Sequence, residues 1–576
     1  MFSNTITVTN TQNLGFGSLR DAVSISLIGD TIRFNPSLIS SGNATIYLTS
    51  AITVNKQLVF KGLYNNTDTL IISGSNTTSI FSFGANQRVV LDSMVLINGY
   101  STTPGGAVKI ESVDSVFILN SVFKDCKSGN RGAGFNFNTG KYNSYFLVKN
   151  TSFINNKTQW LGGAFYIFNG GYLDFNMENS RVLNNWANYD GGGMFFYILS
   201  DTANIKIRDS DISYNETVSN NAGGIGVDAF SYNKTVNVEF INSQLTHNRA
   251  KYGSGGAVSI VNEGANIDLF IDSSKLNNNF SKINGGAIML DCEKSLKITV
   301  NNSEFDSDTS GNSGSAIYTF ARTDSAVVKI IKSTVSNNRS PSSAGVFSRG
   351  VKKSIVDISL STFTKNITSG NAGATIMLSC SPCNPVDQGT CIVNIEKSTI
   401  YQNTATSQYG TGGIYMSPNS TNSLFTISNS ILSDNFPMNY VMGAYTHTSQ
   451  GYNAFSDNFT SGYLPTDIIG ADSSVIFLDN LKYNGGFAKT ISPKIISPLI
   501  NRGQPTDMTE AQNGNIRDTR RDIGACERSA MPHVGIIEND IMSFYTAFPN
   551  PNNGTFTLQF EKEQQITSLF ITDING

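Results

Sequence analysis

Acidic side chains are the residues of this sequence best suited to chemistry on a sugar chain. A carboxylic acid and a carboxylate on either side of a glycosidic bond can cleave it, and clustered aspartates can hold calcium against a uronate. Four aspartates follow a repeated Gly-Gly corner: Asp201, Asp228, Asp291 and Asp324. Counted from the residue after each corner, they fall at four different offsets. We therefore expect them not to share a column of a repeated structure.

The remaining reactive side chains are isolated in the sequence. Asp190 lies beside a glycine run and Asp308 stands alone, so we expect both to be solvated turn residues. The histidines His247, His447 and His533 are scattered, and His247 is expected at a solvated strand end. There is no GxSxG nucleophile motif and no GGxGxD calcium repeat. The sequence predicts no catalytic residue, no metal site and no cofactor.

Aromatic side chains follow several of the Gly-Gly corners. Those that face outward could form a platform for sugar rings, which stack on aromatic faces. Packing in the core is the alternative, because large apolar side chains mostly serve burial. The candidate platform residues are Tyr166, Phe196, Tyr197, Tyr318 and Tyr415.

Two short motifs that alternate along the chain must position these side chains. The first is Gly-Gly, or a close variant, before a small or apolar residue; that residue is Ala107, Gly134, Ala164, Met194, Ile225, Ala257, Ala287, Ala316, Val346, Ala374 or Ile414. The second is Ser or Thr, an apolar residue two positions on, and Asn three positions after that, as in "SRVLNN" and "STFTKN". Together they define a unit of about thirty residues with several short strands.

A unit of this length with short strands predicts one coil of a right-handed parallel β-helix, the crossover rule giving the hand. Gly-Gly supplies positive φ at one corner, and Asn tolerates the left-handed backbone of the other. Stacked Asn amides can also hydrogen-bond along the stack. The expected Asn ladder is Asn156, Asn185, Asn215, Asn248, Asn279, Asn338, Asn366, Asn403 and Asn435, with Cys126 and Asp308 at the two remaining copies.

The apolar residue of the second motif is expected to stack into the core. These residues are Phe123, Phe153, Val182, Ile212, Leu245, Leu276, Phe305, Val335, Phe363, Ile400 and Leu432. A leucine-rich repeat or a propeller is the alternative repeat architecture, but the sequence has no LxxLxL run and no WD or kelch spacing.

Composition limits the partners. Forty basic and 43 acidic residues give a formal charge of -3 without a basic cluster, so nucleic acid is not an expected partner. No run of 18 apolar residues is present, and no membrane-spanning segment is predicted. Cys380, Cys383 and Cys391 lie in an insertion between coils, where a local disulfide is favoured over a zinc site. Cys126 and Cys292 are expected to be buried.

The regular repeat covers residues 101–440, with the N-terminal cap and first coils in 1–100 and C-terminal coils and a cap in 441–530. Leu19, Ala22, Val23 and Leu27 share one face of an expected short helix that covers the open end of the first coil. Residues 531–576 read as a separate small domain.

The corners "GGAF", "GGAV" and "GGAI" with "FINN" and "FTKN" resemble the repeats of chlamydial polymorphic outer membrane proteins and of pectate-lyase-like β-helices. The stretches "ITVTNTQNLGFGSLRDAV", "YNGGFAKTISPKIISPLINRG" and "RRDIGACE" resemble the two ends of bacterial secreted β-helix proteins of the choice-of-anchor Q group. "SPLINRG" and Cys526 depart from that group's usual "SPAIDAG" and "DIGAYE".

"TAFPNPNNGTFTLQF" with "SLFITDING" resembles the start of the C-terminal sorting domain of the type IX secretion system of Bacteroidota-type bacteria, a small β-sandwich. The resemblance implies that Pro549, Asn550, Pro551 and Gly554 form a turn recognised by the export machinery; an ordinary turn between strands is the alternative. The sorting domain normally continues past "DING", and no secretory signal opens the sequence. We therefore expect a fragment of an exported protein, extracellular or on the outer-membrane surface.

Three functions stay open at this point. The sequence favours a non-enzymatic adhesin or glycan-binding protein, with a polysaccharide or a cell-surface glycan as partner. A polysaccharide lyase or glycoside hydrolase is the main alternative, and acidic residues in one column beside a basic residue would favour it. A purely structural stalk is the third. One fold serves many functions, so the fold cannot decide among them.

Overall fold

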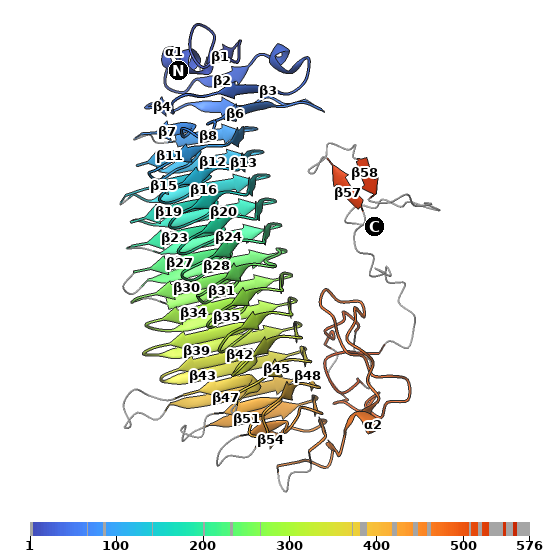
Figure 1. Cartoon of the computed structure of the whole chain (residues 1–576). Helices are drawn as coiled ribbons and strands as arrows, with labels where there is room; N and C mark the ends of the chain where they lie inside the picture. Colours follow the sequence, from blue (N-terminus) through green and yellow to red (C-terminus); the bar gives the residue numbers. More distant parts are fainter. Residues whose placement is uncertain are drawn as a thin grey trace. The chain divides into compact units, whose positions relative to one another are not determined.

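The computed structural model describes residues 4–65, 67–84, 88–140, 142–199, 202–230, 234–264, 266–370, 373–380, 389–416, 423–441, 447–457, 462–505, 509–516 and 521–528, and the backbone of 545–548 and 557–560. The chain folds as two compact units, Met1–Arg528 and Ser529–Gly576. The first unit is a stack of coils (Figure 1).

Each regular coil contains four strands, which stack on their equivalents into sheets that we number in chain order within a coil. Sheet 1 follows the Gly-Gly corner and consists, among the described residues, of β4 (Ile52–Val54), β7 (Phe81–Phe83), β11 (Val108–Glu111), β15 (Phe135–Asn138), β19 (Phe165–Asn169), β23 (Met194–Ile198), β27 (Ile225–Ala229), β30 (Val258–Asn262), β34 (Ile288–Cys292), β38 (Ile317–Ala321), β42 (Ser343–Gly350), β46 (Ala374–Ser379), β50 (Ile414–Met416) and β53 (Tyr440–Val441).

Sheet 2 comes next in the coil. It consists of β1 (Thr5–Val8), β2 (Thr31–Phe34), β5 (Val59–Lys61), β8 (Arg88–Asp92), β12 (Ser115–Leu119), β16 (Ser144–Lys149), β20 (Leu173–Glu178), β24 (Ala203–Arg208), β28 (Thr235–Ile241), β31 (Asn266–Asp272), β35 (Leu296–Asn301), β39 (Ser325–Ile331), β43 (Lys353–Ser359), β47 (Thr390–Glu396), β51 (Leu424–Ser428) and β54 (Thr448–Ser449).

Sheet 3 has two segments, joined through bridges of Gln244 to Asp211 and Lys275. They consist of β3 (Ala44–Tyr47), β6 (Leu70–Ser73), β9 (Val95–Ile97), β13 (Val122–Lys124), β17 (Ser152–Ile154), β21 (Arg181–Leu183) and β25 (Asp211–Ser213), and of β32 (Lys275–Asn277), β36 (Glu304–Asp306), β40 (Thr334–Ser336), β44 (Thr362–Thr364), β48 (Thr399–Tyr401), β52 (Ile431–Ser433), β55 (Ala454–Phe455) and β56 (Ile468–Ile469).

Sheet 4 is built from two-residue strands and closes the coil. It consists of β10 (Tyr100–Ser101), β14 (Lys127–Ser128), β18 (Lys157–Thr158), β22 (Trp186–Ala187), β26 (Glu216–Thr217), β29 (Arg249–Ala250), β33 (Phe280–Ser281), β37 (Thr309–Ser310), β41 (Arg339–Ser340), β45 (Ile367–Thr368) and β49 (Thr404–Ala405).

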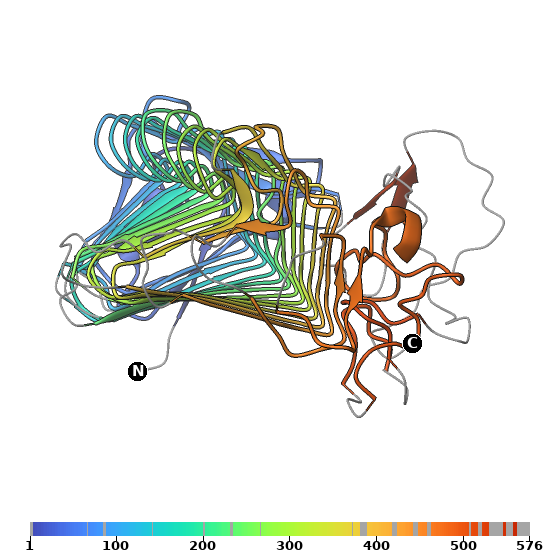
Figure 2. The same ribbon diagram turned by 90° about the horizontal axis from the view of Figure 1, so that it is seen from below.

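All strand pairs in these four sheets are parallel, and each strand pairs with its equivalent one coil away. For example, Phe165 pairs with Phe135 on one side and Met194 on the other. The predicted right-handed parallel β-helix is therefore confirmed. Seen along the stack, the coils superimpose and their corners form continuous edges (Figure 2).

The core fills the inside of the coils. Alternation along each strand sends every second side chain inward, so even short strands contribute side chains to the core. All eleven predicted core residues of sheet 3, from Phe123 to Leu432, have 0% exposure. Each fully buried side chain of this size stabilises the fold by about 1.5–3 kcal/mol.

Three left-handed corners turn each regular coil. The first glycine of the Gly-Gly pair has positive φ, as predicted, with values of 68° at Gly162 and 64° at Gly191. A Cβ at Gly162 would lie 2.2 Å from the Phe165 carbonyl oxygen, so a side chain does not fit there. At the asparagine corner the prediction was wrong by one residue. The left-handed residue precedes the ladder Asn, as Asn155 with φ 57° and His247 with φ 56° show.

The N-terminal end carries helix α1 (Leu19–Ile25) and the 3₁₀ helix η1 (Pro36–Ile39). Ser18 caps α1 by accepting a hydrogen bond from the Asp21 N–H, and Leu19, Ala22 and Val23 are buried in the core. The helix covers the first coil, as the sequence predicts (Figure 1). Leu27 is an exception: the helix ends before it, and its side chain is 66% exposed.

A strap, residues 472–528, packs on the outer face of the second segment of sheet 3. It includes helix α2 (Ser473–Ile476), and its apolar side chains form a small core with Tyr401, Ile431 and Ala454. Gln512 joins it to two coils, with Nε2 donating to Thr334 Oγ1 at 2.8 Å and Oε1 accepting from Thr362 Oγ1 at 2.6 Å. The strap therefore covers strands that would otherwise face solvent.

In the second unit, β57 (Tyr545–Phe548) and β58 (Thr557–Phe560) form an antiparallel pair. Pro549, Asn550, Pro551 and Gly554 lie outside the described residues. In the described part of the chain no helix is both long and apolar enough to cross a membrane.

Candidate functional site

The outward-facing side chains of sheet 1 form two parallel columns. In the first, Tyr166 is followed coil by coil by Phe195, Gly226, Ser259, Met289, Tyr318, Phe347, Met377 and Tyr415. In the second, which we call the sheet 1 strip, the successive residues are Phe168, Tyr197, Asp228, Val261, Asp291 and Phe320. All six residues of the strip are half-buried.

Asp228 occupies the centre of the sheet 1 strip. It lies on β27, between Tyr197 of the coil before and Val261 of the coil after. Burial raises the pKa of its carboxyl to about 7, with smaller contributions from the nearby Asp190 and Glu263 carboxylates. A carboxyl with this pKa can donate or accept a proton near neutral pH.

Asp190 approaches the strip from the corner between sheets 4 and 1. The prediction of a solvated turn residue was wrong, because its exposure is only 7%. Oδ1 accepts a hydrogen bond from the Asn221 N–H at 2.8 Å, and Oδ2 accepts one from Asn220 Nδ2 at 2.9 Å. Burial nevertheless raises the pKa of Asp190 to about 6, against the effect of these two donors. Two carboxyls with raised pKa values therefore lie near each other.

Asp291 ends the acidic part of the strip and is held by an arginine. Arg322 Nε and Nη2 lie 2.8 Å from Asp291 Oδ1 and Oδ2, a bidentate pair that also raises the pKa of Arg322. This pair places a basic group next to the carboxylate of the strip.

Aromatic rings flank the acidic residues. Phe168 and Tyr197 stack with centroids 5.7 Å apart and planes inclined by 11°, and Phe230 packs against Tyr197 at 5.2 Å. Beyond Asp291, the guanidinium of Arg349 lies 4.8 Å from the centre of the Phe320 ring. Aromatic rings thus lie on both sides of the carboxyls of the strip.

The predicted aromatic platform divides into three groups. Phe196 was predicted to face outward and does not: it pairs with Ile167, points into the core and has 0% exposure. Tyr166 does face outward but is only 3% exposed, with Arg131 over its ring at 5.0 Å. Tyr197, Tyr318 and Tyr415 are half-buried on the outer face.

The expectation that the four aspartates share no column was also wrong. Asp228 pairs with Val261, and Val261 pairs with Asp291, so both aspartates stand in the sheet 1 strip. The corner of this coil explains the error, because Ala222 takes the left-handed position that Gly255 and Gly285 take in the next coils. Ile225 therefore pairs with Val258, the residue after Ala257, and an offset counted from Ile225 is one residue smaller than the offset of the same column counted from Ala287. Asp324 pairs with Lys352 at 3.7 Å, and Asp201 lies outside the described residues.

The predicted asparagines form a continuous buried ladder. At each asparagine rung, Nδ2 donates to Oδ1 of the next rung at 2.8–3.3 Å, and the backbone N–H donates to the same oxygen. The rungs are Asn156, Asn185, Asn215, Asn248, Asn279, Asp308, Asn338, Asn366, Asn403 and Asn435, and the ladder continues to Asn439. It is a structural element and lies inside the coil, not at the strip.

Asp308 is a rung of this ladder and not a solvated turn residue. Its exposure is 0%, and Oδ1 accepts from Asn279 N and Nδ2 at 2.8 and 3.0 Å. Oδ2 is buried without a hydrogen-bond partner. Burial raises the pKa of this carboxyl well above its usual range.

A second ladder, of hydroxyl groups, was not predicted. The first residue of the Ser-x-apolar motif has its Oγ accepting the backbone N–H of the equivalent residue one coil earlier, at 3.0–3.3 Å, in the series Ser121, Thr151, Ser180, Ser210, Ser243, Ser274, Ser303, Ser333, Ser361, Ser398 and Ser430. The repeated Ser was visible in the sequence, and a small residue with a hydroxyl at the same position of every coil could have predicted this ladder.

The other candidate residues that the structure describes are not members of the sheet 1 strip. His247 stacks on Tyr214 at a corner, His447 is buried against Tyr440, and His533 lies outside the described residues. Cys380 and Cys391 form a disulfide, so the local disulfide favoured from the sequence is present; Cys383 is not described. Cys126, Cys292 and Cys526 are buried thiols that take part in no disulfide. Over the described residues, no three His, Cys, Asp or Glu side chains are grouped to hold a metal.

A cavity of about 710 Å³ lies on the outer face of sheet 2, lined by Lys329, Asp357, Asn394, Glu396 and Gln504 among others. Its carboxylates are engaged with neighbours: Asp357 Oδ1 accepts from Asn394 Nδ2 at 2.8 Å, and Glu396 pairs with Lys397 at 2.8 Å. We therefore place the candidate site at the sheet 1 strip, where the shifted carboxyls and the ring faces coincide.

The fold and the strip together define the class, a parallel β-helix protein with an acidic and aromatic outer strip. No family model and no curated protein matches the chain. Among solved structures, that of the pectate lyase Pel9A is similar, with 13% identity, coverage of 92% of this chain and 97% of that chain, and a TM-score of 0.28. At this TM-score, the likeness adds nothing to the strand pairing described above.

Proposed function

We propose that this chain is an exported, cell-surface or secreted β-helix protein that binds polysaccharide chains along the sheet 1 strip, as an adhesin-like glycan-binding protein does. The observation that carries the proposal is the order of side chains in the strip: two stacked rings, a carboxyl, an aliphatic residue, a paired carboxyl and another ring. Successive positions are about 4.8 Å apart along the stack. Ring faces accept the apolar faces of sugars, and the carboxyls accept hydrogen bonds from hydroxyls.

Export is supported by two independent features. The Cys380–Cys391 disulfide fits an oxidising compartment. The sequence resembles the choice-of-anchor Q group at both ends of the β-helix, and it resembles type IX sorting domains of Bacteroidota around Pro549 to Gly554. We propose accordingly that residues 531–576 begin a sorting domain, that the type IX machinery is a partner, and that the protein works outside the cell or on its outer-membrane surface.

The test is a pull-down of the full chain on a panel of plant, algal and host polysaccharides. Replacing Tyr197 by Ala removes one stacked ring face and is expected to weaken binding about fivefold, which corresponds to about 1 kcal/mol. Tyr214→Ala is the matched control, because Tyr214 is 54% exposed but lies at the corner after sheet 3 and stacks on His247. Equal losses in the two variants would contradict binding at the strip. Absence of binding to every polymer would favour a structural stalk.

Cleavage of the bound chain is a second candidate, favoured by Asp228 and Asp190. A carboxyl with a pKa of about 7 can protonate a glycosidic oxygen, and a nearby carboxylate can act as the partner base. Reducing ends and the absorbance of unsaturated products would be followed on the same panel. Activity is expected to fall as the pH rises above 7 and Asp228 loses its proton. Asp228→Asn should abolish it; an unchanged rate in this variant would remove the candidate.

A further inference from the structure

A second surface with its own arrangement of side chains lies on sheet 4. A cavity of about 390 Å³ is lined by Tyr100, Lys127, Ser128, Gly129, Lys157, Gln159 and Trp186. Its volume is in the range of small-ligand sites, about 300–1,000 Å³. The strand pairing puts four of these residues in one column, each a coil apart: Tyr100 beside Lys127, Lys127 beside Lys157, and Lys157 beside Trp186.

The two lysines are neighbours of like charge. Facing like charges on adjacent strands destabilise a sheet. Further along the same column the charges are compensated, because Glu216 lies 3.9 Å from Arg249, whose guanidinium stands over the Phe280 ring at 5.2 Å. Among the described residues, neither Lys127 nor Lys157 makes an ion pair or a side-chain hydrogen bond. The column therefore carries a local double positive charge with no ion-pair partner in the described part of the chain.

Aromatic rings lie on both sides of the two lysines along the stack. Tyr100 is 37% exposed and Trp186 is half-buried, and they are separated by three coil spacings, about 14 Å. Trp160, which follows Gln159, is 49% exposed and packs against Tyr189, with ring centroids 5.6 Å apart and planes inclined by 34°. Exposed rings and ammonium groups are thus gathered on this face.

We infer that this part of sheet 4 binds an anionic sugar unit, whose carboxylate or sulfate lies between Lys127 and Lys157 while its ring packs on Tyr100 or Trp186. The ammonium groups supply the missing counter-charge by charge-assisted hydrogen bonds, and Gln159 can bond to a hydroxyl. A single-stranded nucleic acid would also use basic and aromatic groups, but the formal charge of -3 gives no long-range attraction for it. The site is on a different sheet from the sheet 1 strip, so this inference does not depend on the function proposed for the strip.

The test is calorimetric titration of the full chain with four probes of similar length: an oligouronate, a sulfated oligosaccharide, a neutral oligosaccharide and a single-stranded oligonucleotide. We expect binding of the oligouronate or the sulfated chain, weakened by salt, with the neutral chain at least tenfold weaker. A preference between the two acidic sugars identifies the carboxylate or the sulfate as the group recognised. Tighter binding of the oligonucleotide, or equal binding of the neutral chain, would overturn the inference.

Variants locate the site. The double variant Lys127→Gln with Lys157→Gln should lose at least tenfold in affinity for the acidic sugar, and Trp186→Ala about fivefold. Lys206→Gln, at an outward-facing lysine of sheet 2, is the matched control and should bind as the wild type does. The melting temperature of the double variant should be equal to or higher than that of the wild type, because a repulsion has been removed. Undiminished binding by this folded variant, or no binding of either acidic sugar to the wild type, would refute the site.

Discussion

At the scale of single residues, the Asn ladder shows how replacing an amide nitrogen by a carboxyl oxygen changes the hydrogen bonds that a buried side chain can make. Asn and Asp have nearly the same shape, but only Asn supplies a second donor at any pH. At neighbouring rungs Nδ2 also donates to a core carbonyl, as Asn338 does to Phe305 O at 3.2 Å. Asp308 can match this only when it is protonated, and its raised pKa follows from the same environment.

Asp308→Asn should therefore stabilise the protein at neutral and alkaline pH. Because the pKa of Asp308 is raised in the folded state, its contribution to stability is fully present below the unfolded value, about 3.9, and is lost as the pH rises through the folded value. Urea unfolding at pH 5 and pH 8 should show a gain of about 1–3 kcal/mol at pH 8 and a smaller gain at pH 5.

The exposed Asp114→Asn is the control for this measurement and should change stability little at either pH. A loss of stability in Asp308→Asn at pH 8 would mean that the carboxylate is stabilised by a group other than the ladder amides.

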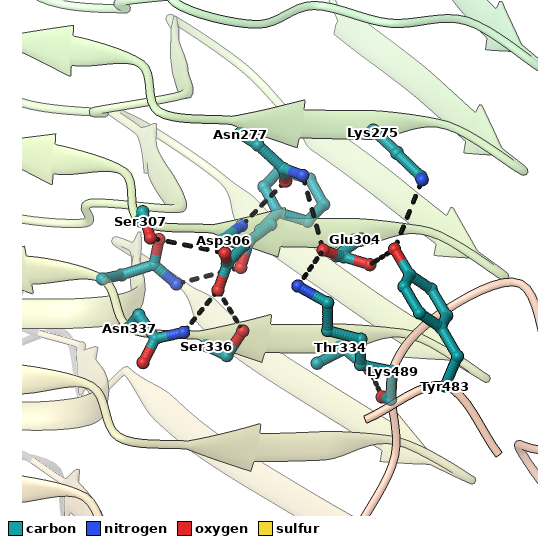
Figure 3. A network of polar contacts seen from close by, with 12 residues as sticks. Lys275, Asn277, Glu304, Asp306, Ser307, Thr334, Ser336, Asn337, Tyr483 and Lys489 are labelled. Atoms are coloured by element: carbon teal, nitrogen blue, oxygen red, sulfur yellow. Dashed lines mark hydrogen bonds and ion pairs between the residues drawn. The ribbon is translucent and has the colours of Figure 1, made fainter. Parts of the chain in front are cut away.

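At the scale of elements, the strap is held at its outer edge by a polar network around Glu304 (Figure 3). The carboxylate is 1% exposed and contacts Lys489 Nζ at 3.6 Å, Tyr483 Oη at 3.3 Å and Asn277 Nδ2 at 3.4 Å. Lys489 and Tyr483 belong to the strap, whereas Glu304 and Asn277 belong to sheet 3. The network is thus a junction between segments far apart in sequence.

Glu304→Gln is expected to loosen this edge of the strap. Hydrogen bonds to a charged partner are worth about 1.5–3 kcal/mol, and the substitution leaves Lys489 without its carboxylate. Hydrogen exchange of backbone amides around residues 482–490 should become faster, while amides of sheets 1 and 2 keep their rates. Glu216→Gln, which removes an exposed pair, should cost no more than about 1 kcal/mol. Equal exchange rates in the strap of wild type and Glu304→Gln would show that Glu304 does not hold it.

An element could be predicted from the sequence where a residue type recurs at a fixed position of each repeat. It could not be predicted where it depends on contacts between distant segments or on the register of strand pairing. The coil, its core column and the Asn ladder follow from a repeated residue type, and all were predicted. The shared column of Asp228 and Asp291 was missed because Ala222 takes the left-handed corner position in its coil, so that Gly223 and Gly224 stand one position later than the glycine pairs of the next coils. Such a shift in register is a property of strand pairing. The strap was missed because contacts such as that of Glu304 with Lys489 leave no periodic pattern. The only local sign is the change to Thr at positions 334, 362 and 399, which the strap covers.

At the scale of the whole first unit, each coil contacts chiefly its two neighbours, so stability should be close to a sum of coil and interface contributions. Deleting residues 108–134 joins Ala107 to Phe135, which is the register partner of Val108. We expect this variant to fold and to unfold cooperatively with a melting temperature near that of the wild type. Deleting only residues 109–134 adds one residue to the strand and reverses its faces. That control should unfold at a clearly lower temperature, and similar stability of the two deletions would contradict the nearest-neighbour description.

The hydrogen bonds between coils run along the axis of the stack, and this gives the molecule a definite response to pulling. A force applied through the two ends of residues 4–471 loads these bonds a few at a time, so coils should detach one after another from an end. Each released coil of about thirty residues would add roughly 100 Å of chain, at up to about 3.5 Å per residue. The coils that contact the strap, from β32 to β55, should resist as one block until the strap itself detaches. In a force-extension trace, such a chain would show a regular series of small steps followed by one larger step. The single coils would dissipate mechanical work one after another, and the coils held by the strap would unfold only at a higher force.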